Sequence, residues 1–263
     1  MPPAHRPLTE SDLLSGAALR RLGRQVYIHE TIDSTNAFLL RTAATAGDGA
    51  FAWTESQTAG RGRLGRQWEA PRGSSILLSV LLFEPPDSPL LAWAALLGAV
   101  AACEAIEAVT DCTPSVRWPN DLVLDGRKLG GILAESCMTG DQWALVIGVG
   151  INCLQHRGHF TGPLAKTAIS LDSATSHSVD RPAVAAALVA RLDAWLTRGE
   201  QWADLHTAWH ARCADVGTRV TLEQDGRRFT GTVLDVSRKA DLIVQLDQGG
   251  RRHFDAATTT RPW

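Results

Sequence analysis

The residues best suited to chemistry lie in the stretch TAGRGRLGRQW, residues 58–68. Three arginines, Arg61, Arg63 and Arg66, alternate there with glycines. Arginine presents forked donors that match phosphate oxygens, and glycine lets backbone N–H groups come close to a ligand. The stretch contains neither the P-loop nor the dinucleotide-binding fingerprint. Its composition therefore favours phosphate binding by a loop of another kind, with a solvated surface loop as the alternative.

A second group of polar residues lies in SVRWPNDLVLDGRKLGGILAE, residues 115–135. Lys128 follows a tight turn and is flanked by apolar strands, which could hold its ammonium near a closed site. An ammonium in that place would stabilise the charge of an acyl-phosphate transition state. Asn120 and Asp121 end a Trp-Pro segment, and a carboxylate is an oxygen ligand of the kind that Mg²⁺ prefers. Taken singly, Lys128 is more typical of a surface turn and Asp121 of an ordinary turn former.

A third group, Ser34, Thr35 and Asn36, lies in TIDSTNAF, residues 31–38. One interpretation is simple capping of the helix that follows. The other is a small polar site, because two hydroxyls and an amide match a ligand with both donors and acceptors, such as a ureido ring.

The elements that must position these groups alternate between strand and helix patterns, which predicts a mixed α/β domain. We expect apolar strands over 51–56, 74–83 and 143–152, and two strands joined by a turn at Asp125-Gly126. We expect helices over 34–44, over the apolar run 90–103, and from Asp180 onward, where Pro182 is typical of a first helical turn.

The pattern changes near Asp215, where apolar and polar residues begin to alternate. Turn signals at Asp225-Gly226 and Gly249-Gly250 predict hairpins and a small all-β module. We therefore predict a catalytic domain over 1–214 and a C-terminal β domain over 215–263. Before that boundary, three tryptophans recur every seven residues across a possible break at Gly199, and we interpret them as core packing: Trp195, Trp202 and Trp209.

Composition narrows the class of protein. The chain has 263 residues, a formal net charge of −2 and a sequence pI of about 6.4. That balance argues against a protein that coats nucleic acid by bulk charge. The five cysteines are spread without a CxxC pair, which predicts reduced thiols and neither a zinc site nor a disulfide framework. The apolar run at 90–103 is too short to span a bilayer, and MPPAHRPLTE lacks the apolar core of a signal peptide, so we expect a cytoplasmic protein.

Taken together and in order, six features resemble the biotin protein ligases over nearly the whole chain: DSTN, QTAGRGRLGRQW, WPND, KLGGILAE, VIGVGIN and a small C-terminal β module. The most specific is GRGRLGR followed by Trp68. The resemblance implies an α/β catalytic domain with a mixed sheet, followed by an SH3-like β-barrel. It also implies a short form without the N-terminal DNA-binding domain that some members use to repress biotin synthesis.

The implied reaction has two steps. Biotin and Mg-ATP give biotinyl-5′-AMP and pyrophosphate, and a lysine of a biotin carboxyl carrier protein domain, for example that of acetyl-CoA carboxylase, then attacks the mixed anhydride. Biotin is the substrate, ATP with Mg²⁺ is the co-substrate, and no tightly bound prosthetic group is implied. We expect no DNA binding and no membrane binding, and a homodimer stays open.

The resemblance also implies roles for residues. The catalytic ones would be Lys128 and Arg63. The biotin contacts would be Ser34, Thr35, Asn36, Gln57, Arg61, Gly62, Arg63 and Lys128. The nucleotide contacts would be Arg61, Arg63, Trp68, Asn120, Asp121 and Asn152. Asp121 would also bind the metal ion. The Arg/Gly loop would close over biotin and ATP and keep the reactive anhydride from water.

The chain departs from the family pattern at two places. The family often has lysine where this chain has Arg117, which keeps the charge but changes its geometry. The C-terminal stretches RKADLIVQL and AATTTRPW lack the usual glycine and acidic signals of the last turns.

Three other functions remain in competition. The first is a lipoate or octanoate ligase or transferase, which shares the catalytic fold. The second is a non-enzymatic Arg/Gly nucleic-acid binder, against which the acidic balance counts. The third is a ligase-like chain kept only as a binding module.

Overall fold

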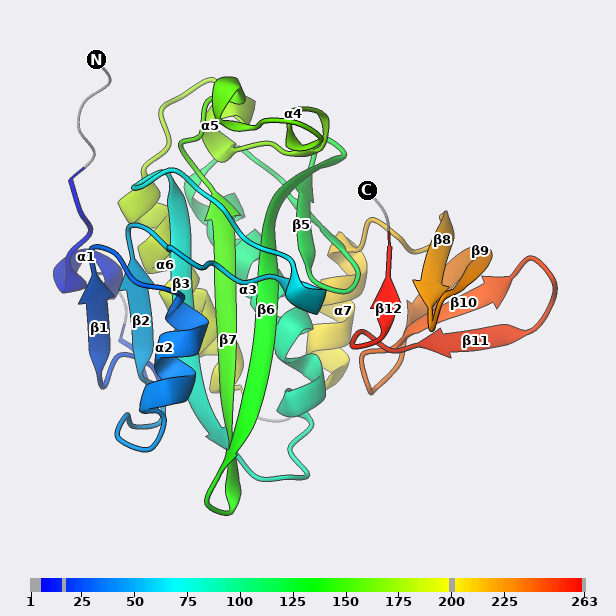
Figure 1. Ribbon diagram of the computed structural model, residues 1–263, viewed down its shortest axis with the longest axis horizontal. Helices are drawn as coiled ribbons and strands as arrows, with labels where there is room; N and C mark the ends of the chain where they lie inside the picture. The colour runs from blue at the N-terminus through cyan, green and yellow to red at the C-terminus, as the bar shows by residue number, and fades with distance from the viewer. Residues whose placement is uncertain (1–5, 16–17, 199–201, 262–263) are drawn as a thin grey trace.

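The structure is a computed structural model that describes residues 6–15, 18–198 and 202–261 (Figure 1). Its centre is a seven-stranded sheet in the order β1-β2-β3-β7-β6-β5-β4. The first two strands pair in parallel and the other pairs are antiparallel, so the predicted mixed sheet is confirmed. The strands are β1 (Val26–His29), β2 (Phe51–Thr54), β3 (Ser75–Glu84), β4 (Ser115–Arg117), β5 (Asp121–Leu124), β6 (Arg127–Thr139) and β7 (Gln142–Asn152).

Helices cover both faces of this sheet (Figure 1). The short helix α2 (Thr35–Thr42) packs on the front face over a small apolar cluster that includes Leu39 and Leu81. The larger cluster lies behind the sheet, beneath α3 (Leu90–Val109) and α6 (Arg181–Leu196). Because both faces of β3 are covered, nearly all of its residues are buried, which explains its unbroken apolar sequence.

Helix α3 has 20 residues and continues beyond the apolar run 90–103, so the expectation that this segment is too short to cross a membrane was wrong by length and composition. In this fold, 61% of its apolar window is buried inside the protein. It is therefore the Ala-rich helix packed against a sheet that its sequence predicts, as is usual for the core helix of a globular domain.

Hairpin turns form at all three predicted dipeptides, including Gly249-Gly250, where φ angles of 95° and 79° lie in the connection between two antiparallel strands of the C-terminal module. Asp125 and Gly126 have φ angles of 51° and 71° and join β5 to β6. Asp225 and Gly226 have φ angles of 52° and 71° and join β8 (Arg219–Gln224) to β9 (Arg227–Val236). Positive φ at both central residues defines the type I′ turn, which Asp-Gly favours because its twist matches that of the strands.

The C-terminal residues form a separate antiparallel sheet in the order β11-β10-β9-β8-β12, completed by β10 (Leu242–Leu246), β11 (Arg251–Phe254) and β12 (Thr259–Thr260). The predicted small β module is thus present. Within residues 202–261, however, no ladder joins β11 to β12, so the sheet does not close into the expected barrel by backbone pairing. Helix α7 (Trp202–Arg212) leads into this module (Figure 1) and contacts β4.

The predicted tryptophan packing holds where the structure describes it. Trp195 and Trp209 are buried, and the ring of Trp202 lies 4.7 Å from that of Trp93 on α3. The proposed break at Gly199 lies outside the described residues. Asp180 caps α6 as expected, its side chain accepting a hydrogen bond from the Ala183 N–H at 3.0 Å.

Some elements were not predicted. The edge strand β1 has only four residues, too few for an alternating pattern to be recognised. The segment 153–180 contains single helical turns that the sequence pattern did not indicate, at η2 (Arg157–His159), α4 (Leu164–Thr167) and α5 (Leu171–Ala174). The turn η1 (Arg63–Gly65) within the Arg/Gly loop was not predicted either. The short helix α1 (Glu10–Leu14) begins directly after Thr9, whose side chain caps it.

Candidate active site

A cavity of about 630 Å³ opens over the front of the central sheet. It is bounded by the start of α2, the Arg/Gly loop, β5 to β7 and the segment that follows β7. Every residue to which the sequence analysis gave a role lines this one cavity: Ser34, Thr35, Asn36, Gln57, Arg61, Gly62, Arg63, Trp68, Asn120, Asp121, Lys128 and Asn152. Residues as far apart in the chain as 34 and 152 are thus brought together by the sheet order.

Hydroxyl and amide groups form one end of the cavity, which we call the amide end: Ser34, Thr35, Asn36 and Gln57. Gln57 Oε1 accepts hydrogen bonds from the backbone N–H of Thr35 at 2.9 Å and from its hydroxyl at 3.2 Å. Ser34 is the N-cap of α2, as predicted, and accepts from the Ala37 N–H. Capping uses the oxygen of Ser34 as an acceptor, so its hydroxyl can still donate to a ligand.

Asn36 is held from three sides. Its Oδ1 accepts from Ser79 Oγ at 2.6 Å, and its Nδ2 donates to Leu133 O at 3.0 Å and to Glu135 Oε2 at 2.9 Å. Both amide hydrogens are therefore used inside the protein, and a ligand can reach only the remaining lone pair of Oδ1. Gly148 makes room for this arrangement, since a Cβ there would lie 2.1 Å from Asn36 Oδ1.

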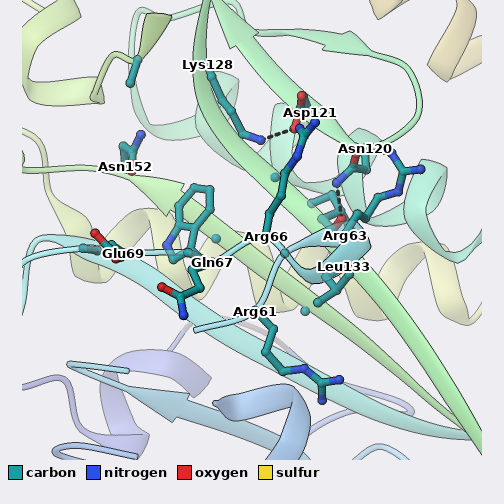
Figure 2. A pocket seen from close by; sticks show the side chains of 18 of the residues that line it. Arg61, Arg63, Arg66, Gln67, Glu69, Asn120, Asp121, Lys128, Leu133 and Asn152 are labelled. Atoms are coloured by element: carbon teal, nitrogen blue, oxygen red, sulfur yellow. Dashed lines mark hydrogen bonds and ion pairs between the residues drawn. The ribbon is translucent and has the colours of Figure 1, made fainter. Parts of the chain in front are cut away.

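The Arg/Gly loop folds back on itself as a small turn. Gly62 N–H donates to Arg66 O at 2.7 Å, and Trp68 N–H donates to Gly60 O at 3.0 Å. At the tip, Leu64 and Gly65 have φ angles of 55° and 74°, a left-handed backbone that places the flanking arginines on different sides. Figure 2 shows Arg61 extending away from Lys128 and Asp121.

Two of the loop arginines have partners on other elements. Arg61 Nη2 lies 2.8 Å from Glu135 Oε1 on β6. Arg63 Nη1 donates to Asn120 Oδ1 at 3.4 Å, and its Nη2 donates to the carbonyl oxygens of Ala256 and Thr259 in the C-terminal module. The loop is thus tied both to the central sheet and to the C-terminal module.

Burial lowers the pKa of the Arg63 guanidinium from its usual value, and the charge of Arg66 lowers it further, whereas Asp121 opposes the shift. The group stays cationic at any physiological pH, because an arginine begins from a very high pKa. A cation that has already lost part of its hydration is favourably placed to meet an anionic ligand.

Trp68 forms a flat wall between the loop and β7. Its ring lies against Gly150, where a Cβ would come within 2.9 Å of the indole carbons. An aromatic ring held in this way offers a face on which a planar ligand group can stack. Trp68 Nε1 and Gln155 Oε1 are buried without a hydrogen-bond partner among the described residues, as are some buried atoms elsewhere in the fold, and both belong to residues that line the cavity.

Lys128 and Asp121 meet near the middle of the cavity (Figure 2). Lys128 reaches from β6 to place its Nζ 2.5 Å from Asp121 Oδ1 on β5. The neighbouring Asn120 is fixed by two hydrogen bonds to Ile132: its Nδ2 donates to the carbonyl, and its own carbonyl accepts from the N–H, both at 2.8 Å. The hairpin that the sequence predicts therefore brings an ammonium, a carboxylate and an amide to one place.

Asn152 lies at the end of β7, where it lines the cavity. Its Nδ2 donates to Ile169 O at 3.1 Å, and its Oδ1 accepts from Gln155 Nε2 at 2.9 Å. Since a carbonyl can only accept, this network fixes which atom of each amide is the oxygen. The predicted nucleotide contact of Asn152 stays a prediction.

The cavity has an excess of positive charge. Among the described lining residues, six side chains are cationic and two are carboxylates: Arg61, Arg63, Arg66, Arg117, Lys128 and Arg261 against Glu69 and Asp121. Burial, followed by the charge of Arg261, lowers the pKa of Arg117. A surface of this sign attracts polyphosphates and carboxylates.

The donor set fits a magnesium ion that arrives with a nucleotide better than a resident metal. The described residues contain no group of three or more His, Cys, Asp or Glu side chains able to hold an ion. Asp121 offers one carboxylate toward the cavity. One carboxylate together with substrate phosphates and water is a common magnesium environment.

Sequence reasoning missed several lining or supporting residues: Ser79, Glu135, Gln155 and Arg261. Glu135 ends the KLGGILAE motif and could have been singled out there. Arg261 lies in the atypical tail, where it pairs with the buried Asp215, and no local signal indicates that the tail reaches the cavity.

Comparison with known proteins shows which family the chain belongs to. A family model described as the Biotin/lipoate A/B protein ligase family matches residues 28–152. The biotin–[acetyl-CoA-carboxylase] ligase of Mycobacterium tuberculosis is 35% identical over 240 residues, which cover 87% of this chain and 85% of that protein. The protein of the same name from Paracoccus denitrificans is 34% identical over 234 residues, covering 86% and 95% respectively.

Among solved structures, the biotin protein ligase of Aquifex aeolicus in complex with biotin and ATP superposes with a TM-score of 0.76 at 24% identity. It covers 91% of this chain and 100% of the other, and supports the same fold. The chain therefore belongs to the Biotin/lipoate A/B protein ligase family, among its biotin protein ligases.

Proposed function

We propose that this protein activates biotin with ATP as biotinyl-5′-AMP and transfers the biotinyl group to a lysine of a biotin carboxyl carrier protein domain. One observation carries the proposal. The polar amide end around Ser34 and Gln57, the Arg/Gly loop and Lys128 all line a single cavity. The relatives named as biotin–[acetyl-CoA-carboxylase] ligases support the choice of substrate and carrier.

The geometry suggests how the first step proceeds. The ureido ring of biotin would occupy the amide end, where Ser34 and Thr35 supply hydroxyls and Gln57 an amide. Its carboxylate would then point toward Lys128, whose ammonium neutralises the carboxylate and the α-phosphate as they approach. Catalysis of this kind depends on positioning and on charge neutralisation, and needs no covalent enzyme intermediate.

The nucleotide would occupy the half of the cavity nearer Trp68 and Asn152. Trp68 offers a face for adenine, and the phosphates would lie among Arg63, Asn120 and Asp121. Magnesium bound with ATP would neutralise phosphate charge there, with Asp121 as the protein carboxylate nearest to it.

In the second step the loop must let the carrier lysine reach the anhydride while limiting access of water. The contacts of Arg63 with the module carbonyls and of Arg61 with Glu135 suit a loop that is held closed without being covalently fixed. The C-terminal module would then support the loop from the side.

We also propose the division of the chain into residues 1–214 and 215–263, because the second sheet begins soon after the boundary, at Arg219.

A cytoplasmic location is supported by the cysteines, which are free thiols, as expected in a reducing compartment. We propose further that the described residues do not bind DNA. A homodimer is an alternative assembly that sedimentation velocity over a range of concentrations can test.

The experiment is transfer to a purified carrier domain, followed by intact mass spectrometry. With biotin, ATP and magnesium present, we expect the carrier to gain one biotinyl group. Omission of ATP or of biotin should abolish the gain, and a carrier with its acceptor lysine changed to arginine should not react. An unmodified wild-type carrier in the complete mixture would contradict the proposal.

A further inference from the structure

Glu135 connects two parts of the cavity that come from different elements. It lies on β6, opposite Val146 of β7, and its side chain is only 20% exposed. One carboxylate oxygen, Oε2, accepts from Asn36 Nδ2 at 2.9 Å. The other, Oε1, lies 2.8 Å from Arg61 Nη2 in the Arg/Gly loop. A single carboxylate thus joins the amide end of the cavity to the loop above it.

The two contacts differ in character. Asn36 is 4% exposed, and its orientation is fixed by Ser79 and by the carbonyl of Leu133. Arg61 is 46% exposed and belongs to a loop whose tip lies in solvent. On its own, so exposed an ion pair would contribute little. Its significance comes from the rigid partner, because the carboxylate is already oriented by Asn36 before the arginine meets it.

We propose that Glu135 is a positioning residue that couples the rigid Asn36 of the amide end to Arg61 and so holds the Arg/Gly loop over the cavity. Because Asn36 is already fixed, it keeps the Glu135 carboxylate oriented, and the oriented carboxylate keeps Arg61, and with it the turn at 61–67, in place. The identity of the ligand that this loop covers rests on the proposed function, whereas the coupling of Asn36 to Arg61 does not.

The two contacts of residue 135 require a carboxylate. Both Asn36 Nδ2 and Arg61 Nη2 are donors, so the residue between them must accept on two sides. In Glu135→Gln, one oxygen could accept from one partner while the amide nitrogen would face the other donor. Glu135→Ala removes both acceptors. The glutamine variant keeps the size of the side chain and therefore controls for packing.

The first test measures hydrogen exchange in the protein without ligand. The backbone amides of Gly62 and Trp68 close the loop turn, so they report on its order. We expect Glu135→Gln and Glu135→Ala to speed exchange over 60–68 by about tenfold, equivalent to about 1.4 kcal/mol, while exchange in β3 and β7 stays unchanged. Asp247→Asn, which removes the carboxylate of the exposed Arg219 pair, is the matched control and should leave the loop unaffected.

Unchanged exchange over 60–68 in both Glu135 variants would overturn the proposal. So would faster exchange spread evenly over the central sheet, because that would indicate a purely structural role. If one of the two Glu135 variants fails to fold, the exchange rates of the other variant test the proposal. The hydrogen-exchange test requires no catalytic activity, so it gives a result even if the proposed function is wrong.

The second test uses biotin-dependent pyrophosphate release. A positioning role predicts that Glu135→Gln raises KM for biotin by about tenfold while kcat changes less than about threefold, because the reacting atoms do not touch Glu135. Arg61→Gln combined with Glu135→Gln should be no worse than the more severe single variant, since both remove the same coupling. Additive losses, or a loss confined to kcat, would contradict the coupling. Absence of biotin-dependent release in the wild type would instead count against the proposed function.

Discussion

Lys128 Nζ and Asp121 Oδ1 lie 2.5 Å apart on the two strands of one hairpin, β6 and β5. Their side chains are 26% and 14% exposed, so the pair is partly shielded from solvent but open to the cavity. The carboxylate holds the ammonium in a defined place before any anion arrives. When a carboxylate and a triphosphate enter, the ammonium can turn to their oxygens and the carboxylate can turn to their magnesium. The pair is thus suited to a reaction that joins two anions.

The first prediction concerns this ammonium. Lys128→Met should reduce the rate of biotinyl-5′-AMP formation by about 10²–10³-fold, because a positioned positive charge at the developing anion is lost. Pyrophosphate release in a single turnover measures the effect. Lys239→Met, at an exposed position of the C-terminal module, should retain the wild-type rate. A Lys128→Met rate within threefold of wild type would exclude the assigned role.

The second prediction concerns retention of the intermediate. Arg63→Gly should leave the protein folded but allow biotinyl-5′-AMP to escape, because the loop loses its contacts with Asn120 and with the carbonyls of Ala256 and Thr259. Filtration followed by mass spectrometry of the filtrate measures the free adenylate. The control is Arg72→Gly. It removes another arginine from the segment between β2 and β3, one that pairs with Glu30, and this variant should retain the adenylate. Equal retention by wild type and Arg63→Gly would contradict the closing role of the loop.

The third prediction uses the close packing of Gly148 on Asn36. Gly148→Ala would place a Cβ 2.1 Å from Asn36 Oδ1 and must displace that side chain. We expect biotin binding, measured by calorimetry, to weaken by about tenfold or more, equivalent to at least about 1.4 kcal/mol. Gly158→Ala is the control, because a Cβ there meets nothing within 4 Å and its backbone is not left-handed. Unaltered biotin affinity in Gly148→Ala would show that Asn36 plays no part in the site.

The fourth prediction concerns the base of the Arg/Gly loop. Glu55 and Arg181 form an ion pair of 2.8 Å with side chains only 4% and 2% exposed. Glu55 also accepts from the Leu8 N–H and the Trp53 indole. Removing one partner leaves a buried charge without its counter-ion, so Arg181→Met should lower the free energy of unfolding by about 3–5 kcal/mol.

Urea denaturation measures this change. The control is Arg219→Met, which breaks an exposed pair and should leave the urea midpoint unchanged. A similar midpoint for Arg181→Met and the wild type would show that the buried pair does not stabilise the loop base.

The fifth prediction concerns the buried cysteine thiols and how their contribution to stability depends on pH. Burial raises the pKa of the Cys103 and Cys153 thiols from 9.0 to about 12. At pH 8 both are therefore neutral and shielded, and should react with iodoacetamide far more slowly than the partly exposed Cys137. Because the folded pKa lies above the unfolded one, the stability that these thiols contribute is complete below pH 9 and is lost as the pH rises toward 12.

Peptide mapping after timed alkylation measures the order of labelling, and urea midpoints from pH 8 to pH 11 measure the loss of stability. Rapid labelling of Cys153 in folded protein at pH 8 would contradict the burial of that thiol.

Local patterns allowed much of the fold to be predicted. The Asp-Gly turns, the cap at Asp180 and the uninterrupted apolar run of β3 each depend on residues close in sequence, so short-range rules identify them. The edge strand β1 could not be predicted in this way, because its pairing with β2 depends on a distant partner and not on its own four residues.

The residues of the candidate site also differ in whether short-range patterns in the sequence indicate them. Motifs in the sequence singled out Lys128, the Arg/Gly loop and the Ser34–Asn36 cluster, and all of them line the cavity. The roles of Glu135 and Arg261 were not indicated in this way, because they arise from contacts across large sequence separations: Glu135 with Asn36, and Arg261 with Asp215 at the edge of the cavity. Closure of the C-terminal barrel was the least supported expectation, and the tail that departs from the family pattern is where the described sheet stays open.

The central claim is that the amide end selects biotin for adenylation. The most direct measurement is pyrophosphate release from ATP and magnesium with biotin, lipoate or octanoate supplied separately, read together with mass spectrometry of the acyl-AMP. The account predicts release and an acyl-AMP with biotin alone. Release with lipoate or octanoate in place of biotin would contradict the role of Ser34, Thr35 and Gln57, and release with none of the three would contradict the proposed reaction itself.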